Sequence, residues 1–396
     1  MDFCKPELPP HRRALLTAFA MAAVAPPGLA HARGTAAGHG ADTMRLAMAW
    51  RGPGDAAMGK ASPSGDMIGV MELDWAAGRM RVAGACAVPT RAHGLAALAG
   101  GGFVATANRP GRWLLRCDGQ ARVEARLALD DAGSEGKRTL NGHAHVSADG
   151  HWLFTSETDP ADGRGYVAVR DLRTLRRIAE FDSGGIDPHD LSIGADGSLW
   201  VGNGGILRTP DGRKVERAEM ASALVRLHPA TGALLDRFTL DDPQLSLRHL
   251  AWSHALGDSA AWLGVALQAE HAQPHQRAAA PALAVHDGQA LRIATSDASG
   301  SGYAGDIVAG PGGGFVLSAQ KARRVLWWNP ARPQHLATVG ELSDPCALVA
   351  LAPRREGVVV GAARGAGRWQ LRGEAGMLAW PVALAPDNHA VALHDA

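Results

Sequence analysis

The chain has 396 residues, of which 46% are hydrophobic and 20% are charged, and its formal net charge is +1. This length suits two ordinary domains or one large repetitive domain. The near-zero charge and the lack of a Lys/Arg cluster argue against nucleic acid as the main partner. The 49 Gly and 23 Pro follow neither a collagen period nor a low-complexity tract, so they indicate many turns.

Residues 1–32 are predicted to be an export signal. The pair Arg12-Arg13 precedes an apolar stretch that runs to Val24, and Ala30-His31-Ala32 has the small-x-small form of a cleavage site. The paired arginines favour the twin-arginine (Tat) export route, with the Sec route as the alternative. The apolar stretch of about 12 residues is too short for a bilayer span, which needs about 20. We therefore expect a soluble periplasmic protein with no membrane span in its mature form.

Residues 33–43 form a Gly/Ala/His-rich segment that we expect to be a flexible linker. Beyond it, apolar runs of 4–7 residues alternate with turn signals such as Asp-Gly, Gly-Gly and Asn-Pro. Short strands with regular turn signals predict an all-β sandwich, barrel or propeller. Examples of such runs are residues 102–106, 151–155, 198–202, 261–265, 314–318 and 357–361.

Histidine recurs at one structural position, namely after a polar or turn-forming lead-in and before a short apolar run. Five segments have this form, and two more place Asp or Cys in the same slot. The seven slot residues are His93, His145, His189, His249, Asp306, Cys346 and His389, with steps of 52, 44, 60, 57, 40 and 43 residues. Because each step holds about four strands, the period is that of a propeller blade.

The seventh blade is predicted to be split between the two ends of the chain. The C-terminal segment 388–393 supplies one inner strand, and segments 46–50, 68–73 and 80–84 supply strands without a histidine lead-in. Joining them closes the ring and removes an exposed edge. We therefore predict an all-β fold in which residues 44–396 form a single seven-bladed β-propeller, which we expect to be a monomer.

The seven slot residues are expected to face one another at one mouth of the central channel. Neutral His is the commonest protein metal ligand, and Asp and Cys also bind metals. A metal site usually has three or four ligands at about 2.0–2.3 Å, so only a subset can reach one ion. We expect three or four neighbouring histidines to bind iron or copper, with zinc as a further option. The candidate ligands are His93, His145, His189, His249, His389, Asp306, Cys346 and, on the strand of His145, His143.

Other interpretations of the ring remain open. It is also suited to an anionic or small polar ligand, or to purely structural capping of strand ends. Asn141 and Arg248 flank the ring, where they either orient a ligand or cap turns. Cys86 and Cys117 are 31 residues apart on predicted neighbouring strands, so an oxidising compartment permits a disulfide between them.

Several segments resemble the bacterial family known as domain of unknown function 1513. They are residues 141–145, 185–191, 201–206, 245–251 and 387–389, and the resemblance covers essentially the whole mature chain. It implies an exported propeller, often with a twin-arginine signal. The family's genes commonly neighbour those of imelysin-type and di-haem oxidase-like proteins, which implies a link to iron uptake and to other periplasmic iron-uptake proteins as partners. The resemblance implies a compartment and a process rather than a reaction.

We therefore predict a periplasmic propeller that binds a transition metal at the histidine ring and serves iron or copper acquisition or handling. Whether it is an enzyme stays open, although the composition of the ring favours a non-enzyme. One alternative is a hydrolase of the lactonase type, which would use a divalent ion at the channel mouth. Histidine outnumbers carboxylates in the ring, which disfavours hydrolysis dependent on Ca²⁺ or Mg²⁺. Another alternative is a scaffold that docks partner proteins without catalysis.

Overall fold

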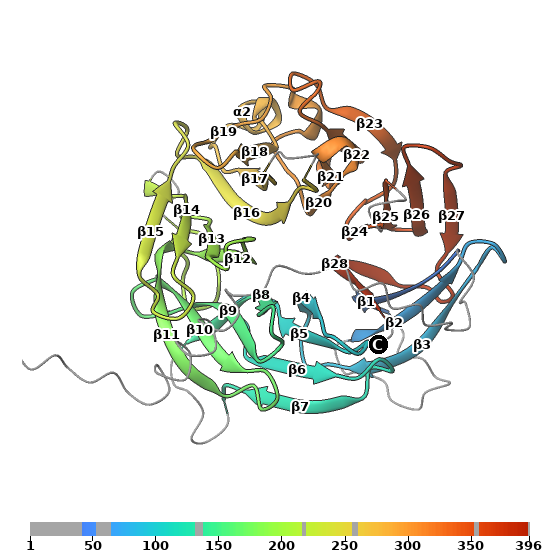
Figure 1. The fold of residues 1–396 in the computed structure, drawn as a ribbon, viewed down its shortest axis with the longest axis horizontal. Helices are drawn as coiled ribbons and strands as arrows, with labels where there is room; N and C mark the ends of the chain where they lie inside the picture. Colours follow the sequence, from blue (N-terminus) through green and yellow to red (C-terminus); the bar gives the residue numbers. More distant parts are fainter. Residues whose placement is uncertain are drawn as a thin grey trace, which may run out of the picture.

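Seven four-stranded antiparallel sheets surround a central channel in the part of the chain that the structure describes (Figure 1). The structure is a computed structural model and describes residues 42–52, 65–130, 138–215, 219–255, 260–351 and 356–394. The expected export signal 1–32 and residues 33–41 of the expected linker lie outside the described residues. The predicted all-β, seven-bladed propeller is confirmed.

Six blades each use four consecutive strands, and the first strand of each lies innermost (Figure 1). Blade 1 is β4 (Ala92–Ala97), β5 (Phe103–Ala107), β6 (Trp113–Cys117) and β7 (Val123–Ala128). Blade 2 is β8 (Thr139–Val146), β9 (Trp152–Thr158), β10 (Arg164–Asp171) and β11 (Arg177–Ile186). Blade 3 is β12 (Pro188–Ile193), β13 (Leu199–Asn203), β14 (Ala223–Leu227) and β15 (Leu234–Phe238).

The same pattern continues around the ring. Blade 4 is β16 (Leu245–Trp252), β17 (Leu263–Ala269), β18 (Leu283–His286) and β19 (Leu291–Ile293). Blade 5 is β20 (Ile307–Ala309), β21 (Phe315–Ala319), β22 (Arg324–Trp328) and β23 (Ala337–Glu341). Blade 6 is β24 (Leu348–Ala350), β25 (Gly357–Ala362), β26 (Gly365–Gln370) and β27 (Gly376–Ala379).

Blade 7 joins the two ends of the chain, as predicted. Its inner strand β28 (Ala385–Leu393) pairs antiparallel with β1 (Thr43–Arg51), with Ala390 opposite Met48. The outer strands are β2 (Asp66–Asp74) and β3 (Arg79–Ala87). This pairing gives β1 a hydrogen-bonded neighbour on each side and closes the circle.

The hydrophobic core lies between neighbouring blades rather than in the channel. Phe103 of blade 1 packs in one cluster with Ile68 of blade 7, and Phe154 of blade 2 packs with Val225 of blade 3. The second strands are covered on both faces, and all five residues of β5 are buried. Because these strands are buried on both faces, their sequences are continuous apolar runs. Each large buried side chain contributes about 1.5–3 kcal/mol to folding.

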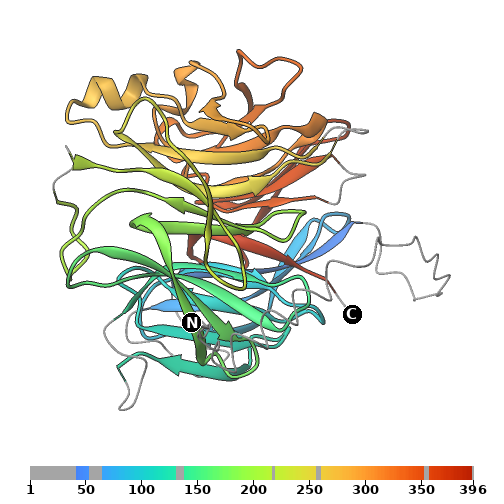
Figure 2. The same ribbon diagram turned by 60° about the vertical axis from the view of Figure 1, so that its left-hand side comes forward.

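Helical structure is peripheral. The short helix α2 (Pro274–Ala279) lies at the rim of the disc in both views (Figures 1 and 2). Three 3-10 turns lie in the same part of the chain, namely η3 (Ala298–Gly300), η4 (Pro311–Gly313) and η5 (Gln320–Ala322). Within the described ranges, no helix has the length and apolar character required to cross a membrane. Cys86, Cys117 and Cys346 are free thiols, so the structure contains no disulfide between Cys86 and Cys117.

Candidate metal centre

Five inner strands carry a β-bulge at their histidine. The pairing with the second strand skips from Ala92 to Leu95, from Leu140 to Ala144, from Pro188 to Asp190 and from Leu247 to Leu250, and residues 387–389 of β28 lie at an equivalent shift against β1. A bulge leaves residues unpaired and redirects a side chain. The five redirected residues are His93, His143, His189, His249 and His389.

Side chains on the second strand of the preceding blade donate hydrogen bonds to backbone carbonyls in the bulges. Thr106 donates its hydroxyl hydrogen bond to the carbonyl of Gly142 in the next blade at 2.7 Å, and Ser156 donates in the same way to His189 at 2.8 Å. Both side chains are fully buried. Because buried carbonyls need a partner, these contacts fix the position of each histidine relative to the preceding blade.

The five imidazoles form a closed ring in the channel. Consecutive ring centroids lie 4.6–4.9 Å apart all the way around. Four of the residues each offer a nitrogen, and these four nitrogens lie within 4.8 Å of one another: His93, His143, His249 and His389, called the His cluster below. Around a tetrahedral ion with metal–nitrogen bonds of about 2.0–2.1 Å, four nitrogens lie about 3.3 Å apart. A modest inward movement would therefore bring the cluster onto one ion.

Three members of the His cluster are each oriented by a carboxylate that is buried or partly buried. Their Nδ1 atoms lie 3.1–3.3 Å from a carboxylate oxygen in the pairs His93–Asp387, His143–Asp190 and His389–Asp306. A carboxylate accepts a hydrogen bond, so the imidazole proton belongs on Nδ1 and the lone pair on Nε2. This carboxylate–histidine arrangement is the one that orients metal ligands in proteins.

The inward nitrogens lack protein partners. Among the residues that the structure describes, the Nε2 atoms of His143 and His389 and the Nδ1 atom of His249 are buried without a hydrogen-bond partner. Leaving a buried polar atom unpaired costs about 1–3 kcal/mol, so such atoms call for an explanation. The carboxylate-bound tautomers of His143 and His389 leave a lone pair on Nε2, and a cation held between these separate blades could accept both lone pairs.

The orienting carboxylates are themselves rigidly held. Asp190 accepts a hydrogen bond from the backbone N–H of Leu250 in the next blade at 2.8 Å. Asp306, which directly precedes β20 of blade 5, accepts a hydrogen bond from the backbone N–H of Leu348 in blade 6, also at 2.8 Å. Each carboxylate therefore ties two inner strands together while it positions a histidine. The set of ligands is preorganised by the same contacts that hold neighbouring blades in register.

Burial keeps most of the imidazoles neutral. It lowers the pKa of His93 to about 3 despite the hydrogen bond to Asp387. It also lowers the pKa of His143, and it lowers the pKa of His249 well below the usual value. Burial acts in the same direction on His389, but the carboxylates of Asp306, Asp190 and Asp387 together outweigh it, and the pKa of His389 is raised. Neutral imidazole is the form that binds a metal.

Residues 86–393 match the family described as "Protein of unknown function (DUF1513)". The match covers more than half of the chain. The chain belongs to this family. The predicted family is thereby confirmed, and no curated protein matches the chain.

Solved propellers are similar in fold. Hydrazine synthase from Kuenenia stuttgartiensis is 14% identical, with a TM-score of 0.53 over 81% of this chain and 94% of that one. A catalytically inactive virginiamycin B lyase from Staphylococcus aureus, with quinupristin, is 12% identical, with a TM-score of 0.50 over 74% and 85%. The Dos1 propeller is 10% identical, with a TM-score of 0.50 over 88% and 86%. Similarity at this level shows a shared fold alone.

The remaining ring candidates of this family member lie around the His cluster. His189 is the fifth imidazole of the ring, outside the group of four. His145 lies one pleat further along β8 than His143 and lines a cavity of about 280 Å³ in the channel. Asp306 contacts His389 through its carboxylate. The thiol of Cys346 donates to the carbonyl of Gly361, and burial raises its pKa to about 12, which disfavours the thiolate that binds metals.

The two residues expected to orient a ligand have different surroundings. The side-chain amide of Asn141 donates to the carbonyl of Pro188 in the next blade and to the hydroxyl of Thr158, both at 2.8 Å, so it bridges blades 2 and 3. Arg248 is buried beside Asp187, with the nitrogen and oxygen 3.3 Å apart.

Sequence reasoning missed the orienting carboxylates Asp190 and Asp387. The local signal was present, because each lies within two residues of a ring histidine. Their partners, however, belong to other blades: Asp387 contacts His93, and Asp190 contacts His143.

Proposed function

We propose that the protein binds one transition-metal ion at the His cluster. The observation that carries this proposal is the pairing of buried Nδ1–carboxylate hydrogen bonds with buried, unpartnered Nε2 atoms at His143 and His389. Nitrogen ligands of this kind suit copper, zinc, iron and nickel. The buried carboxylates of Asp306 and Asp387 and the partly buried carboxylate of Asp190 would offset the charge of the ion.

The biological role that we propose is iron or copper handling in the periplasm, in line with the twin arginines at the start of the chain. A ring formed by five separate blades would suit tight, selective retention of an ion, because the propeller fixes the ligand positions.

The lactonase-type alternative has less support. Hydrolysis dependent on Ca²⁺ requires a site built mainly from oxygen ligands. The carboxylates of Asp190 and Asp306 are instead engaged by imidazoles and by backbone N–H groups. A nitrogen-rich site would favour a softer ion than Ca²⁺.

The test is metal analysis of the protein purified from the periplasm and of chelator-treated protein titrated with Cu²⁺, Zn²⁺ and Fe²⁺. We expect one equivalent of a transition metal. His143→Ala should lose it or bind at least a hundredfold more weakly. His145→Ala is the matched control, because it removes an imidazole two residues away on the same strand but outside the His cluster.

The result to compare is the metal content of the two variants. Loss in His143→Ala and retention in His145→Ala would support the His cluster. Equal metal stoichiometry and affinity in wild type and His143→Ala would overturn the proposal that the His cluster binds the metal. Preferential loss of metal in His145→Ala would instead indicate a metal site in the cavity that His145 lines.

A further inference from the structure

The connection between β13 and β14 of blade 3 is long, and its described residues 204–215 reach as far as blade 1. Residues 204–222 join β13 to β14, whereas residues 108–112 suffice between the equivalent strands of blade 1. The connection starts at Gly204, whose carbonyl accepts hydrogen bonds from Ser222 and Ser246, both at 2.8 Å. Arg208 and Lys214 then pair across an isolated β-bridge. The turn between them packs at Gly212 against Pro110 of blade 1.

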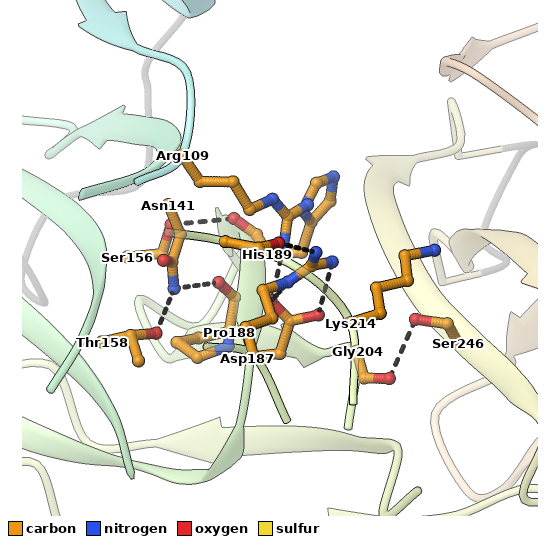
Figure 3. Close-up of polar contacts among 12 residues, drawn as sticks. Arg109, Asn141, Ser156, Thr158, Asp187, Pro188, His189, Gly204, Lys214 and Ser246 are labelled. Carbon is orange, nitrogen blue, oxygen red and sulfur yellow. Dashed lines mark hydrogen bonds and ion pairs between the residues drawn. The ribbon is translucent and has the colours of Figure 1, made fainter. Parts of the chain in front are cut away.

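This connection delivers one cation to each of two buried carboxylates, Arg208 to Asp187 and Lys214 to Glu270. Asp187 is 3% exposed and lies just before β12. Arg109 of blade 1 donates to its Oδ1 at 2.5 Å, Arg208 donates to the same atom at 3.0 Å, and Arg248 of blade 4 donates to its Oδ2 at 3.3 Å. Lys214 donates in turn to Glu270, which directly follows β17 of blade 4. Figure 3 shows Arg109, Asp187 and Lys214 together in this region.

Positive charge exceeds negative charge at this place. Four cationic side chains, called the cationic mouth below, surround two carboxylates, those of Asp187 and Glu270, which leaves a surplus of two positive charges. The four are Arg109, Arg208, Lys214 and Arg248. Arg248 also lies 4.0 Å from Glu270, but two carboxylates cannot neutralise four cations, so a further anion would stabilise this arrangement.

The pKa values of side chains in the cationic mouth are lowered by burial and by the neighbouring positive charges. Burial, with Arg248 and Arg208 nearby, lowers the pKa of Arg109 to about 9 although Asp187 raises it. Burial and Arg248 likewise lower the pKa of Lys214 to about 8. Within the described part of the chain, the Nε atom of Arg248 is buried without a hydrogen-bond partner, and its side chain is 3% exposed. An Arg N–H group can only donate, so the missing partner must be an acceptor.

We propose that the cationic mouth binds an oxyanion, namely a carboxylate or phosphate group of a small molecule, directly above the His cluster. Guanidinium groups match the planar or tetrahedral oxygens of such groups with paired hydrogen bonds. The exposed fractions of 14% for Arg109, 17% for Arg208 and 21% for Lys214 leave these side chains reachable from solvent. The proposal does not depend on metal binding.

The cationic mouth is in direct contact with the ring of imidazoles. Arg109 donates from its second Nη to Nδ1 of His189, and Arg248 is the residue before His249. An anion drawn to these arginines would therefore sit beside the imidazoles. It could arrive as a free oxyanion or as the carboxylate of a metal chelate, and both have the same recognition chemistry.

The test is calorimetric titration of the full-length protein with inorganic phosphate and with citrate. We expect 1:1 binding to wild type and at least tenfold weaker binding to Lys214→Gln and to Arg208→Gln. The matched control is Arg213→Gln, which removes the same charge next to Lys214 from a side chain that is 79% exposed and paired with Asp211. Its affinity should stay within twofold of wild type.

Further titrations distinguish a free oxyanion from a metal chelate, and they test the anion proposal separately from the metal proposal. Titrations use chelator-treated and metal-loaded wild type, and also His143→Ala. Equal citrate affinity in all three supports a free oxyanion, and tighter binding that needs metal supports a chelate. Absence of phosphate and citrate binding, or equal loss in Lys214→Gln and Arg213→Gln, overturns the cationic mouth whatever the metal content.

Discussion

The Nε2 atoms of His189 and His249 lie 2.9 Å apart, so one must donate a proton and the other accept it. Arg109 decides which, because its guanidinium can only donate and it contacts Nδ1 of His189. That Nδ1 must be the accepting nitrogen. His189 is therefore the Nε2–H tautomer, which donates into the ring toward His249.

This relationship predicts the tautomer of a single histidine. Nitrogen-15 NMR of the metal-free protein should show His189 protonated on Nε2 and unprotonated on Nδ1. Among the described residues, Arg109 is the only hydrogen-bond donor to this Nδ1, so the Nδ1–H form should become populated in Arg109→Met. An unchanged tautomer in Arg109→Met would mean that another contact sets it.

Removing one orienting carboxylate should weaken the metal site without destroying it. Asp190→Asn keeps the shape of the side chain that contacts His143 but loses its charge. Outer-shell partners of this kind are typically worth 10–100-fold in metal affinity, and we expect a loss in that range at unchanged stoichiometry. Competition with a fluorescent chelator measures it. Asp182→Asn is the control, since Asp182 pairs with Arg164 away from the channel, and a matching loss there would contradict the orienting role.

The choice between His143 and His145 shows where sequence reasoning ends. Both residues lie on the same face of β8, two positions apart, and the repeat aligned His145 with the other histidines. The structure places His143 in the His cluster because the β-bulge falls before Ala144. A bulge inserts residues into one strand against its partner, so its position depends on pairing that a spacing of histidines does not specify.

The blade count was predictable, whereas the cationic mouth was not. Turn signals and apolar runs recur with every blade, and this local pattern carries the fold. The partners of Asp187 come instead from positions 109, 208 and 248, in three different blades. Pairing across blades leaves no local pattern in the sequence.

A buried ion pair in blade 2 should make a large contribution to stability. Arg170 and Glu157 are 0% and 1% exposed and lie 2.6 Å apart, with Thr155 as a shared partner. Glu157→Ala leaves a buried guanidinium without its carboxylate, so the free energy of unfolding should fall by about 3–5 kcal/mol.

Denaturant titration followed by circular dichroism measures this change. Glu124→Ala is the control, because Glu124 is 44% exposed in its pair with Arg116. Exposed pairs contribute about 0–1 kcal/mol. A loss in Glu157→Ala no larger than that of Glu124→Ala would show that the buried pair is not a major source of stability.

Oxyanion binding should weaken as the pH rises through about 8. Burial, then Arg248, lowers the pKa of Lys214 to about 8, while Glu270 raises it and Arg208 lowers it further. Below that pH the ammonium group is charged and attracts the anion, and above it the charge is lost. Sulfate is the probe, since its own charge is constant in this range. Its affinity should fall roughly tenfold between pH 7 and pH 9, as one charged hydrogen bond is lost.

The substitution Lys214→Arg isolates the residue responsible, because a guanidinium stays charged throughout this range. Its sulfate affinity should be nearly flat to pH 8.5, where the affinity of wild type has already fallen. Calorimetry at half-unit pH steps gives both curves. Parallel curves for wild type and Lys214→Arg would show that Lys214 is not the titrating group, and a flat wild-type curve would contradict the predicted pH dependence.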